Sequence, residues 1–266
     1  MSTIVLVTGS NTGLGLEIVR ALFNSSVTYT LILACRSLDK AIKAIELIKN
    51  DYPESKSEAW GVELDLENDE SIKKCFEVIS GKVDRLDVLV NNAGAQFDLA
   101  LRDNTMSIRE IWNKTWDINV TGTHIVTHTF APLLLSSHSP RLLFITSGVS
   151  SLSATEDSTL PLDRPPPPGW PKDAQLIDFP AYRSSKTGMN MLVRQWTRWL
   201  KEDGVKVFAV SPGLLATGLG GMGADMMKKM GAEDPKVGGE FVRNVVEGKQ
   251  DEFAGKVIRR AGVQPW

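Results

Sequence analysis

Tyr182 and Lys186 lie four residues apart at the start of a long run with apolar residues at helical spacing. In a helix this spacing places both side chains on one face, one turn apart. A free tyrosine has a pKa of about 10 and is a poor proton donor at neutral pH, but an ammonium within about 4–6 Å favours the phenolate. The pair could therefore give a proton to a developing alkoxide or take one from an alcohol. Taken alone, such a pair is more often two surface residues of a helix.

Length and composition limit what the rest of the chain can be. The 266 residues are 42% hydrophobic and 23% charged, with a net charge of −2 and no basic tract, which argues against a nucleic-acid partner. The two cysteines are too few for a disulfide framework or a metal cluster and suit a reducing compartment. An apolar run begins at Thr3, which leaves no room for a signal peptide, and no run approaches the ~20 residues that span a bilayer. We therefore expect a cytoplasmic protein.

The first apolar run ends in a glycine-rich turn that leads into a helical pattern. The turn holds Gly9, Gly13 and Gly15, and apolar residues at helical spacing follow it. Glycines let the backbone approach a pyrophosphate closely, and a helix amino terminus offers free N–H groups and partial positive charge. The spacing differs from the usual G-x-G-x-x-G fingerprint, but its place directly after the first strand predicts a dinucleotide site.

The second apolar run, residues 29–35, ends at Arg36. In a dinucleotide fold an Asp or Glu at this place binds the ribose 2′-hydroxyl of NAD. An arginine instead suits the 2′-phosphate of NADP, and Asn11 in the glycine turn could support the same phosphate. The alternative is a solvated surface arginine.

Two later strand ends carry polar residues. Asp65 follows a short strand near residues 58–64, where its carboxylate could accept from the adenine amino group or prepare a helix capped by Asn68 or Asp69. The buried strand 86–90 ends in Asn-Asn-Ala-Gly, residues 91–94, which fits the ligand crevice of an open α/β sheet but also an ordinary turn.

Residues 108–135 read as one long helix with Asn119 on its apolar side. Asparagine is unfavourable inside a helix unless its amide is engaged. His124 and His128 lie one turn apart, but no third ligand with the usual spacing accompanies them, so we predict no metal site.

The pattern changes after the strand 141–145 and Ser147. Residues 151–180 lose their periodicity and include four consecutive prolines, so we expect a loop that forms a lid, although a proline-rich segment could also bind a partner. The helix 181–200 and the strand 205–210 follow. A second lid is expected at about residues 214–232, where methionines could pack around an irregular ligand. The alternation of strands and helices predicts one α/β domain, residues 1–266, with a parallel sheet covered on both faces.

In this order and spacing, the motifs resemble the short-chain dehydrogenase/reductase family. The matching residues are Thr8, Gly9, Gly13, Gly15, Asp65, Asn91, Asn92, Ala93, Gly94, Asn119, Ser147, Tyr182, Lys186, Pro212, Gly213 and Thr217. The resemblance covers the chain from residue 3 to about residue 260. It implies a doubly wound Rossmann-like parallel sheet with strand order 3-2-1-4-5-6-7.

The resemblance also implies roles for four residues. Tyr182 would be the general acid and base, and Lys186 would lower its pKa and hold the nicotinamide ribose. Ser147 would bind the substrate carbonyl oxygen, and Asn119 would anchor a water that relays protons to Lys186. Two O–H donors aimed at that oxygen suit the negative charge that hydride addition builds there.

The expected ligand contacts follow from the same motifs. The cofactor would be NADP(H), bound by Gly9, Asn11, Thr12, Gly13, Leu14, Gly15, Arg36, Asp65, Leu66, Asn91, Ala93, Gly94, Tyr182, Lys186, Pro212, Gly213, Leu215 and Thr217. The substrate would contact Gln96, Phe97, Val149 and the two lids.

Two departures from the family pattern stand out. Tyr182 lies 182 − 147 = 35 positions after Ser147, where the family usually has about a dozen, which indicates an insertion of roughly twenty residues. The monomeric carbonyl reductases have similar insertions and resemble this chain at Asn11 and Arg36, so we expect a monomer. The carboxyl-terminal residues 259–262 match the family's closing strand only loosely.

The leading hypothesis is an NADPH-dependent reductase of a ketone or aldehyde, in which Tyr182 protonates the oxygen. Apolar pocket walls favour a hydrophobic, secondary-metabolite-type substrate. Reduction of an imine or reduction-coupled cyclisation is an alternative that product analysis would separate. A non-catalytic dinucleotide-binding regulator is a third, although a sensor has no need of a proton donor.

Overall fold

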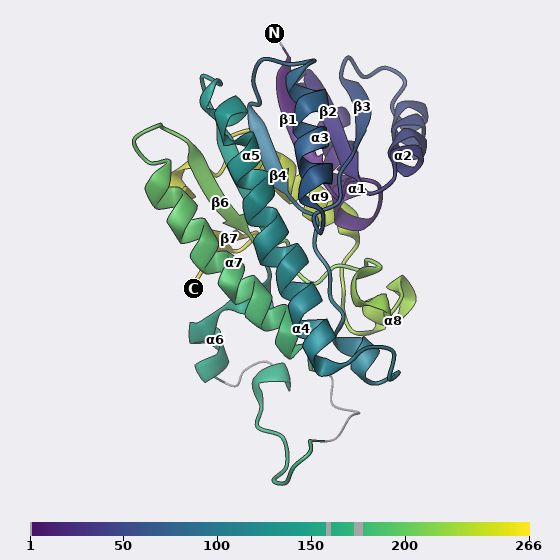
Figure 1. The fold of residues 1–266 in the computed structure, drawn as a ribbon, viewed down its shortest axis with the longest axis vertical. Helices are drawn as coiled ribbons and strands as arrows, with labels where there is room; N and C mark the ends of the chain where they lie inside the picture. The colour runs from purple at the N-terminus through teal and green to yellow at the C-terminus, as the bar shows by residue number, and fades with distance from the viewer. Residues whose placement is uncertain (1, 158–160, 173–177) are drawn as a thin grey trace.

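The computed structural model describes residues 2–157, 161–172 and 178–266. Within these residues, strands and helices alternate along the chain and eight strands form one sheet in the order β3-β2-β1-β4-β5-β6-β7-β8 (Figure 1). The strands are β1 (Thr3–Thr8), β2 (Tyr29–Cys35), β3 (Glu58–Glu63), β4 (Val88–Asn91), β5 (Arg141–Ile145), β6 (Lys206–Val210), β7 (Val257–Arg259) and β8 (Gly262–Gln264). The helices are α1 (Gly13–Phe23), α2 (Leu38–Asp51), α3 (Asp69–Ser80), α4 (Ile108–Trp116), α5 (Thr123–Leu135), α6 (Leu152–Glu156), α7 (Pro180–Trp199), α8 (Ala224–Lys229) and α9 (Pro235–Val246).

The sheet is parallel from β3 to β7, which confirms the predicted doubly wound fold and its strand order. Beyond the seven expected strands, β8 pairs antiparallel with β7 and extends the edge. A strand of three residues is too short to display a periodic pattern, so it could not be predicted from the sequence.

Side chains alternate between the two faces of the sheet, as the period of a strand requires. Val5 and Val7 of β1 pack with apolar residues of α1, α2 and α9. Ile4 and Leu6 point the other way, into a core shared with α3, α5 and α7. Because both faces are covered, the strands are apolar on both sides and their carboxyl ends remain as the place for a site.

The predicted helix at residues 108–135 is not one regular helix. A π-helical turn, η2 (Asp117–Gly122), joins α4 to α5 and contains Asn119. Gly122 in this turn packs against the segment that follows β3, since a Cβ on it would be 2.2 Å from the backbone oxygen of Leu66. Such turns are rare and occur frequently at functional sites.

The expected insertion, residues 151–180, contains α6 and a 3₁₀ turn, η4 (Pro161–Asp163), and part of it, residues 158–160 and 173–177, lies outside the described residues. The two histidines on α5 belong to an aromatic group, because the ring of His124 lies 5.6 Å from Trp196 and 6.3 Å from Trp199. No set of three or more potential metal ligands gathers in the described parts of the chain. Nor does any helix there have the length and apolar character to cross a membrane.

Candidate active site

Lys186 is buried within α7, and its environment disfavours its charge. Its Nζ donates a hydrogen bond to the backbone oxygen of Ile145 at the end of β5, at 2.8 Å. Burial lowers the pKa of Lys186 from its usual 10.5 to about 8, because an ammonium loses hydration inside the protein. The lysine is therefore held at the carboxyl end of the sheet with a proton that it releases near pH 8, well below its ordinary range.

Tyr182 lies one turn before Lys186, as the spacing predicts. The Nζ of Lys186 is 5.8 Å from the centre of the Tyr182 ring. Burial raises the pKa of Tyr182 to about 12, and a hydrogen bond with the Ser147 side chain opposes that rise. Burial outweighs the influence of Ser147, so the phenol is favoured in its neutral form. The lowering of the Tyr182 pKa by Lys186, which the family resemblance implies, stays a prediction.

The turn that carries Ser147 follows β5 and is fastened to α7. Asn190 accepts a hydrogen bond from the Thr146 hydroxyl at 2.6 Å and donates one to the Ser150 hydroxyl at 3.0 Å. Thr187 donates to the backbone oxygen of Ser150 at 2.9 Å. This support was not predicted from the sequence, although Thr187 and Asn190 lie three residues apart and so on one face of the helix.

The new strand β8 holds the same turn from the other side. Gln264 is 4% exposed, and its side-chain amide donates to the backbone oxygen of Ser147 at 3.2 Å. A polar side chain at the end of a short strand gave no signal in the sequence for this contact. Ser147 is therefore held by both α7 and the carboxyl-terminal hairpin.

Asn119 is fully buried in η2, and its amide is engaged, as its place in the sequence requires. Its Oδ1 accepts from the backbone N–H of Ala95 at 2.8 Å, and its Nδ2 donates to the Ala95 oxygen and to the Ser185 hydroxyl, both at 2.9 Å. Both amide protons are therefore used, so a water at Asn119 would have to donate to Oδ1.

Gly94 brings the segment after β4 close to both Asn119 and Lys186. A Cβ placed on Gly94 would lie 3.1 Å from Asn119 Oδ1 and 3.4 Å from Lys186 Nζ. A side chain at this position would therefore crowd both atoms. The proton-relay water at Asn119 stays a prediction.

The glycine turn after β1 is tied to the end of β4. Asn92 donates to the backbone oxygens of Thr8 and Gly9 at 2.8 and 3.2 Å. A Cβ on Gly15 would lie 2.2 Å from the Gly9 oxygen, and Gly9 itself has a positive φ of 63°. These glycines are needed for close backbone packing, which forms the turn at the carboxyl edge of the sheet.

The same turn leaves the start of α1 open to an anion. Thr12, the N-cap residue, makes no side-chain capping bond, and the first N–H groups of a helix have no partner within it. Gly13 has a φ of 54°, and a Cβ on it would lie 3.5 Å from Thr217, which brings the segment after β6 next to the turn. An uncapped helix start beside a glycine turn fits the pyrophosphate of a dinucleotide.

Arg36 lies beside this turn, because Gly9 and Ser10 donate backbone hydrogen bonds to Ala34, two residues before it. The Arg36 side chain is exposed and forms no ion pair with any residue that the structure describes. Asp65 bends back on its own chain and accepts from the Glu67 N–H at 3.2 Å, while Asn68 caps α3. The second expectation for Asp65, that it prepares the next helix, is thus compatible with this local turn.

Other cofactor residues predicted from the sequence lie around the same edge. The side chain of Asn91 is buried and donates to Thr127 of α5 at 2.9 Å. Gly213 has a φ of 104°, and Leu215 is buried against Leu14 and Gly238. Asn11 lies in the glycine turn after β1, and Ala93 lies in the segment after β4. Leu66 and Pro212 lie in the segments that follow β3 and β6.

The methionine-rich segment after β6 approaches the predicted substrate residues. Gly220 in the turn η5 (Leu219–Gly221) lies against Gln96, since a Cβ on it would be 2.9 Å from the Gln96 side chain. The Gln96 Nε2 is buried and has no hydrogen-bond partner among the described residues. Met222 and Met227 pack together within the segment. Gln96 therefore offers a free amide donor under this lid.

The insertion is attached next to Tyr182. Arg183 forms an ion pair with Asp163 of η4, whose side chain is 2% exposed. The same guanidinium donates to the backbone oxygen of Val149 at 3.2 Å and to that of Leu162 at 3.4 Å. One arginine thus joins the catalytic helix, the insertion and the predicted substrate residue Val149.

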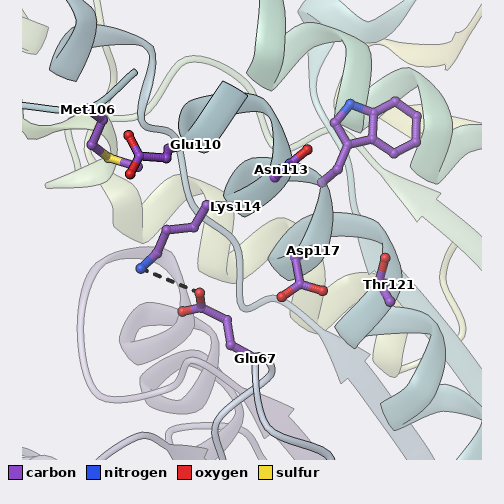
Figure 2. A pocket seen from close by; sticks show the side chains of 8 residues that line it. Glu67, Met106, Glu110, Asn113, Lys114, Asp117 and Thr121 are labelled. Atoms are coloured by element: carbon purple, nitrogen blue, oxygen red, sulfur yellow. Dashed lines mark ion pairs between the residues drawn. The ribbon is translucent and has the colours of Figure 1, made fainter. Parts of the chain in front are cut away.

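A separate pocket of about 650 Å³ lies between α4, η2 and the segment after β3. Figure 2 shows Lys114 pointing to Glu67, with which it forms an ion pair at 3.4 Å, and Glu110 and Asp117 nearby. None of Ser147, Tyr182 and Lys186 lines this pocket. Its charged lining does not suit an apolar carbonyl compound, so it is not the candidate site.

Comparisons with known proteins agree with this arrangement. The model of the family described as short chain dehydrogenase matches residues 3–158 and 173–237. The chain is 46% identical to the short-chain dehydrogenase/reductase EupG of a Phoma species, covering 99% of this chain and 97% of that one. It is 43% identical to the short-chain dehydrogenase/reductase TropE of Talaromyces stipitatus, covering 98% and 97%.

Solved structures share the fold at lower identity. The NADPH-bound carbonyl reductase from chicken fatty liver superposes with a TM-score of 0.77 at 21% identity over 100% of both chains. A variant of the actinorhodin polyketide ketoreductase with NADPH gives a TM-score of 0.74 at 20% identity, covering 98% of this chain and 96% of that one. With the motifs in their expected places, this chain belongs to the short-chain dehydrogenase family of oxidoreductases.

Proposed function

We propose that this protein is an NADPH-dependent reductase of a ketone or aldehyde, with Tyr182 as the proton donor. The observation that carries the proposal is that the side chains of Tyr182 and Ser147 interact, while the Nζ of Lys186, one turn along α7, lies 5.8 Å from the Tyr182 ring. Two O–H donors at one point can stabilise the oxyanion that forms when a carbonyl carbon accepts a hydride.

For the cofactor we propose NADP(H). The uncapped start of α1 and its glycine turn would hold the pyrophosphate, and Lys186 would hold the ribose next to the nicotinamide. The exposed Arg36 would pair with the 2′-phosphate, which NAD lacks. Bound nicotinamide supplies the hydride. The chicken carbonyl reductase with this fold was solved with NADPH, which is in line with the choice.

The residues of the chain would share the work as follows. Ser147 Oγ and the Tyr182 hydroxyl would orient the carbonyl oxygen, and Tyr182 would pass its proton to that oxygen. Lys186 Nζ would then return a proton to the phenolate. A water that donates to Asn119 would connect Lys186 to the solvent.

The substrate would be a medium-sized hydrophobic carbonyl compound of the secondary-metabolite type. Phe97, Val149 and the methionines of the lid offer apolar surface, and the free Gln96 amide offers one donor for a polar substituent.

The expected monomer stays a prediction. Its basis is the insertion, which Arg183 attaches to the first turn of α7. Further along that helix, Met191 and Trp199 are exposed, so a solution mass measurement is needed to decide between one chain and an assembly.

The test is the loss of NADPH absorbance with a panel of aromatic and aliphatic ketones, aldehydes and quinones. Tyr182→Phe should lower kcat by about 10²- to 10⁴-fold while NADPH still binds. Arg36→Asp should reduce the preference for NADPH over NADH. Equal use of both cofactors by the unaltered protein would contradict the assignment of Arg36. Saturable NADPH binding with no turnover on the whole panel would contradict the reductase and favour a dinucleotide-binding regulator.

A further inference from the structure

The helix that carries Tyr182 and Lys186 has no cap of its own. Phe179, at the N-cap position of α7, has no side chain that can accept a hydrogen bond, and Pro180 follows at the first position without an N–H. The next two N–H groups, of Ala181 and Tyr182, therefore need an acceptor from elsewhere.

Asp98 supplies that acceptor from a distant part of the chain. Its Oδ1 accepts from the Ala181 N–H at 2.8 Å and its Oδ2 from the Tyr182 N–H at 3.2 Å. Asp98 begins the 3₁₀ turn η1 (Asp98–Leu101), 83 residues before Ala181. Each carboxylate oxygen takes one N–H, and a negative charge suits the positive end of the helix.

The segment that holds Asp98 is itself fixed. Asn119 bonds both the N–H and the C=O of Ala95, three residues earlier. The same Asn119 donates to Ser185, whose hydroxyl in turn donates to the backbone oxygen of Tyr182 at 2.8 Å. The turn of α7 that contains Tyr182 is thus held at one end by Asp98 and at the other by Asn119 through Ser185.

We propose that Asp98 is a positioning residue for the reaction, which fixes the backbone of Tyr182 relative to the end of β4. The proposal rests on the proposed reductase function. Asp98 does not touch the reacting atoms; it acts by setting where the Tyr182 hydroxyl lies against Ser147. The Tyr182 hydroxyl must lie at hydrogen-bonding distance from the carbonyl oxygen. A small displacement of the first turn of α7 would move the hydroxyl out of reach of that oxygen.

The charge state of Asp98 agrees with this role. Burial is the largest influence on its pKa and raises it, followed by the opposing hydrogen bonds from Ala181 and Tyr182. The carboxylate is thus kept at a place that disfavours its charge, where its two N–H donors are the compensating contacts.

Three variants test the proposal. Asp98→Ala removes both acceptors, Asp98→Asn keeps one oxygen acceptor, and Asp103→Asn changes an exposed acid in the same segment as a control. We expect Asp98→Ala to lower kcat by about 10- to 100-fold with the KM for NADPH little changed. Asp98→Asn should fall between it and the unaltered protein, and Asp103→Asn should equal the unaltered protein.

Hydrogen exchange of the peptide at residues 180–186, followed by mass spectrometry, gives a readout that needs no activity. The Ala181 and Tyr182 amides should exchange about tenfold faster or more in Asp98→Ala and at the original rate in Asp103→Asn. If Asp98→Ala does not fold, as judged by circular dichroism, the Asn variant carries both measurements.

The outcomes separate this inference from the proposed function. Equal kcat in all folded variants would overturn the positioning role of Asp98. An unaltered protein that turns over no carbonyl would overturn the proposed function, and exchange would then decide about Asp98 alone. In that case faster exchange in Asp98→Ala would support its hold on Tyr182, and unchanged exchange would overturn it.

Discussion

Burial changes the acidity of Tyr182 and Lys186 in opposite directions. It raises the pKa of the phenol to about 12 and lowers that of the ammonium to about 8, because in each case the neutral form is favoured. Over the physiological range the tyrosine therefore keeps its proton, and the lysine is the group of the pair that titrates.

This difference predicts the pH dependence of the reduction. The rate should be high below about pH 8 and fall at higher pH, because Lys186 loses the proton with which it replenishes Tyr182. The measurement is kcat/KM against pH in the reducing direction, which reports groups of the free enzyme. Lys186→Arg should lose this alkaline limb whatever its absolute rate, because arginine stays charged. A limb that persists in that variant would assign the titration to another group.

Among the connections between elements, the one from Arg183 to Asp163 joins the insertion to α7. Asp163→Asn should loosen the insertion, because the amide keeps one oxygen acceptor for Arg183 but loses the charge that strengthens the bond. We expect proteolytic cleavage in the insertion to become about tenfold faster or more, and the KM for the carbonyl substrate to rise. Arg183 keeps its bonds to Val149 and Leu162, so α7 should stay in place and NADPH binding should not change.

Asp157→Asn is the matched control, because Asp157 is an exposed acid of the same insertion at the end of α6. It should leave both cleavage and the KM as they are. If cleavage and KM are equally unaffected in Asp163→Asn, the ion pair does not hold the lid.

Elements with a strong repeating pattern were predictable, and the contacts between them were not. The strands 29–35 and 141–145 were predicted with the bounds that the structure gives, because their apolar runs are bounded by polar residues. Tyr182, Lys186 and the glycine turn followed from local spacing. Asp98, Gln264 and Arg183 form hydrogen bonds with residues that lie 83, 117 and 20 positions away in the sequence. A single polar residue does not show which distant residue it will contact. The π turn at Asn119 was hidden because apolar spacing alone does not record one extra residue in a helix.

At the scale of the whole molecule, several buried groups keep their protons in the folded state. Burial raises the pKa of Tyr29 to about 12, with Glu247 as the next cause, and it raises the pKa of Cys75 and Tyr182 to about 12 as well. Lys186 has the opposite effect: between about pH 8 and 10.5 it has lost its proton in the folded state but keeps it in the unfolded state. Above pH 10.5, therefore, the folded state binds more protons than the unfolded state.

The free energy of unfolding should consequently fall as the pH rises from 10.5 to 12. Tyr29→Phe removes one of the groups responsible. In this variant the free energy of unfolding should fall less steeply between pH 10.5 and 12, by about 1.4 kcal/mol per pH unit. Urea unfolding of both proteins at several pH values measures the two slopes. Parallel slopes would mean that Tyr29 does not retain its proton in the folded state.

The bond from Gln264 to Ser147 has a consequence for how the protein is made. Ser147 is held by a residue that the ribosome adds 117 positions later, and among the described residues the strand that carries Gln264 pairs with β7 alone. Chains fold from the amino terminus during synthesis, so the turn that carries Ser147 waits for the last strand. A nascent chain should thus complete this turn only after its final residues have left the ribosome.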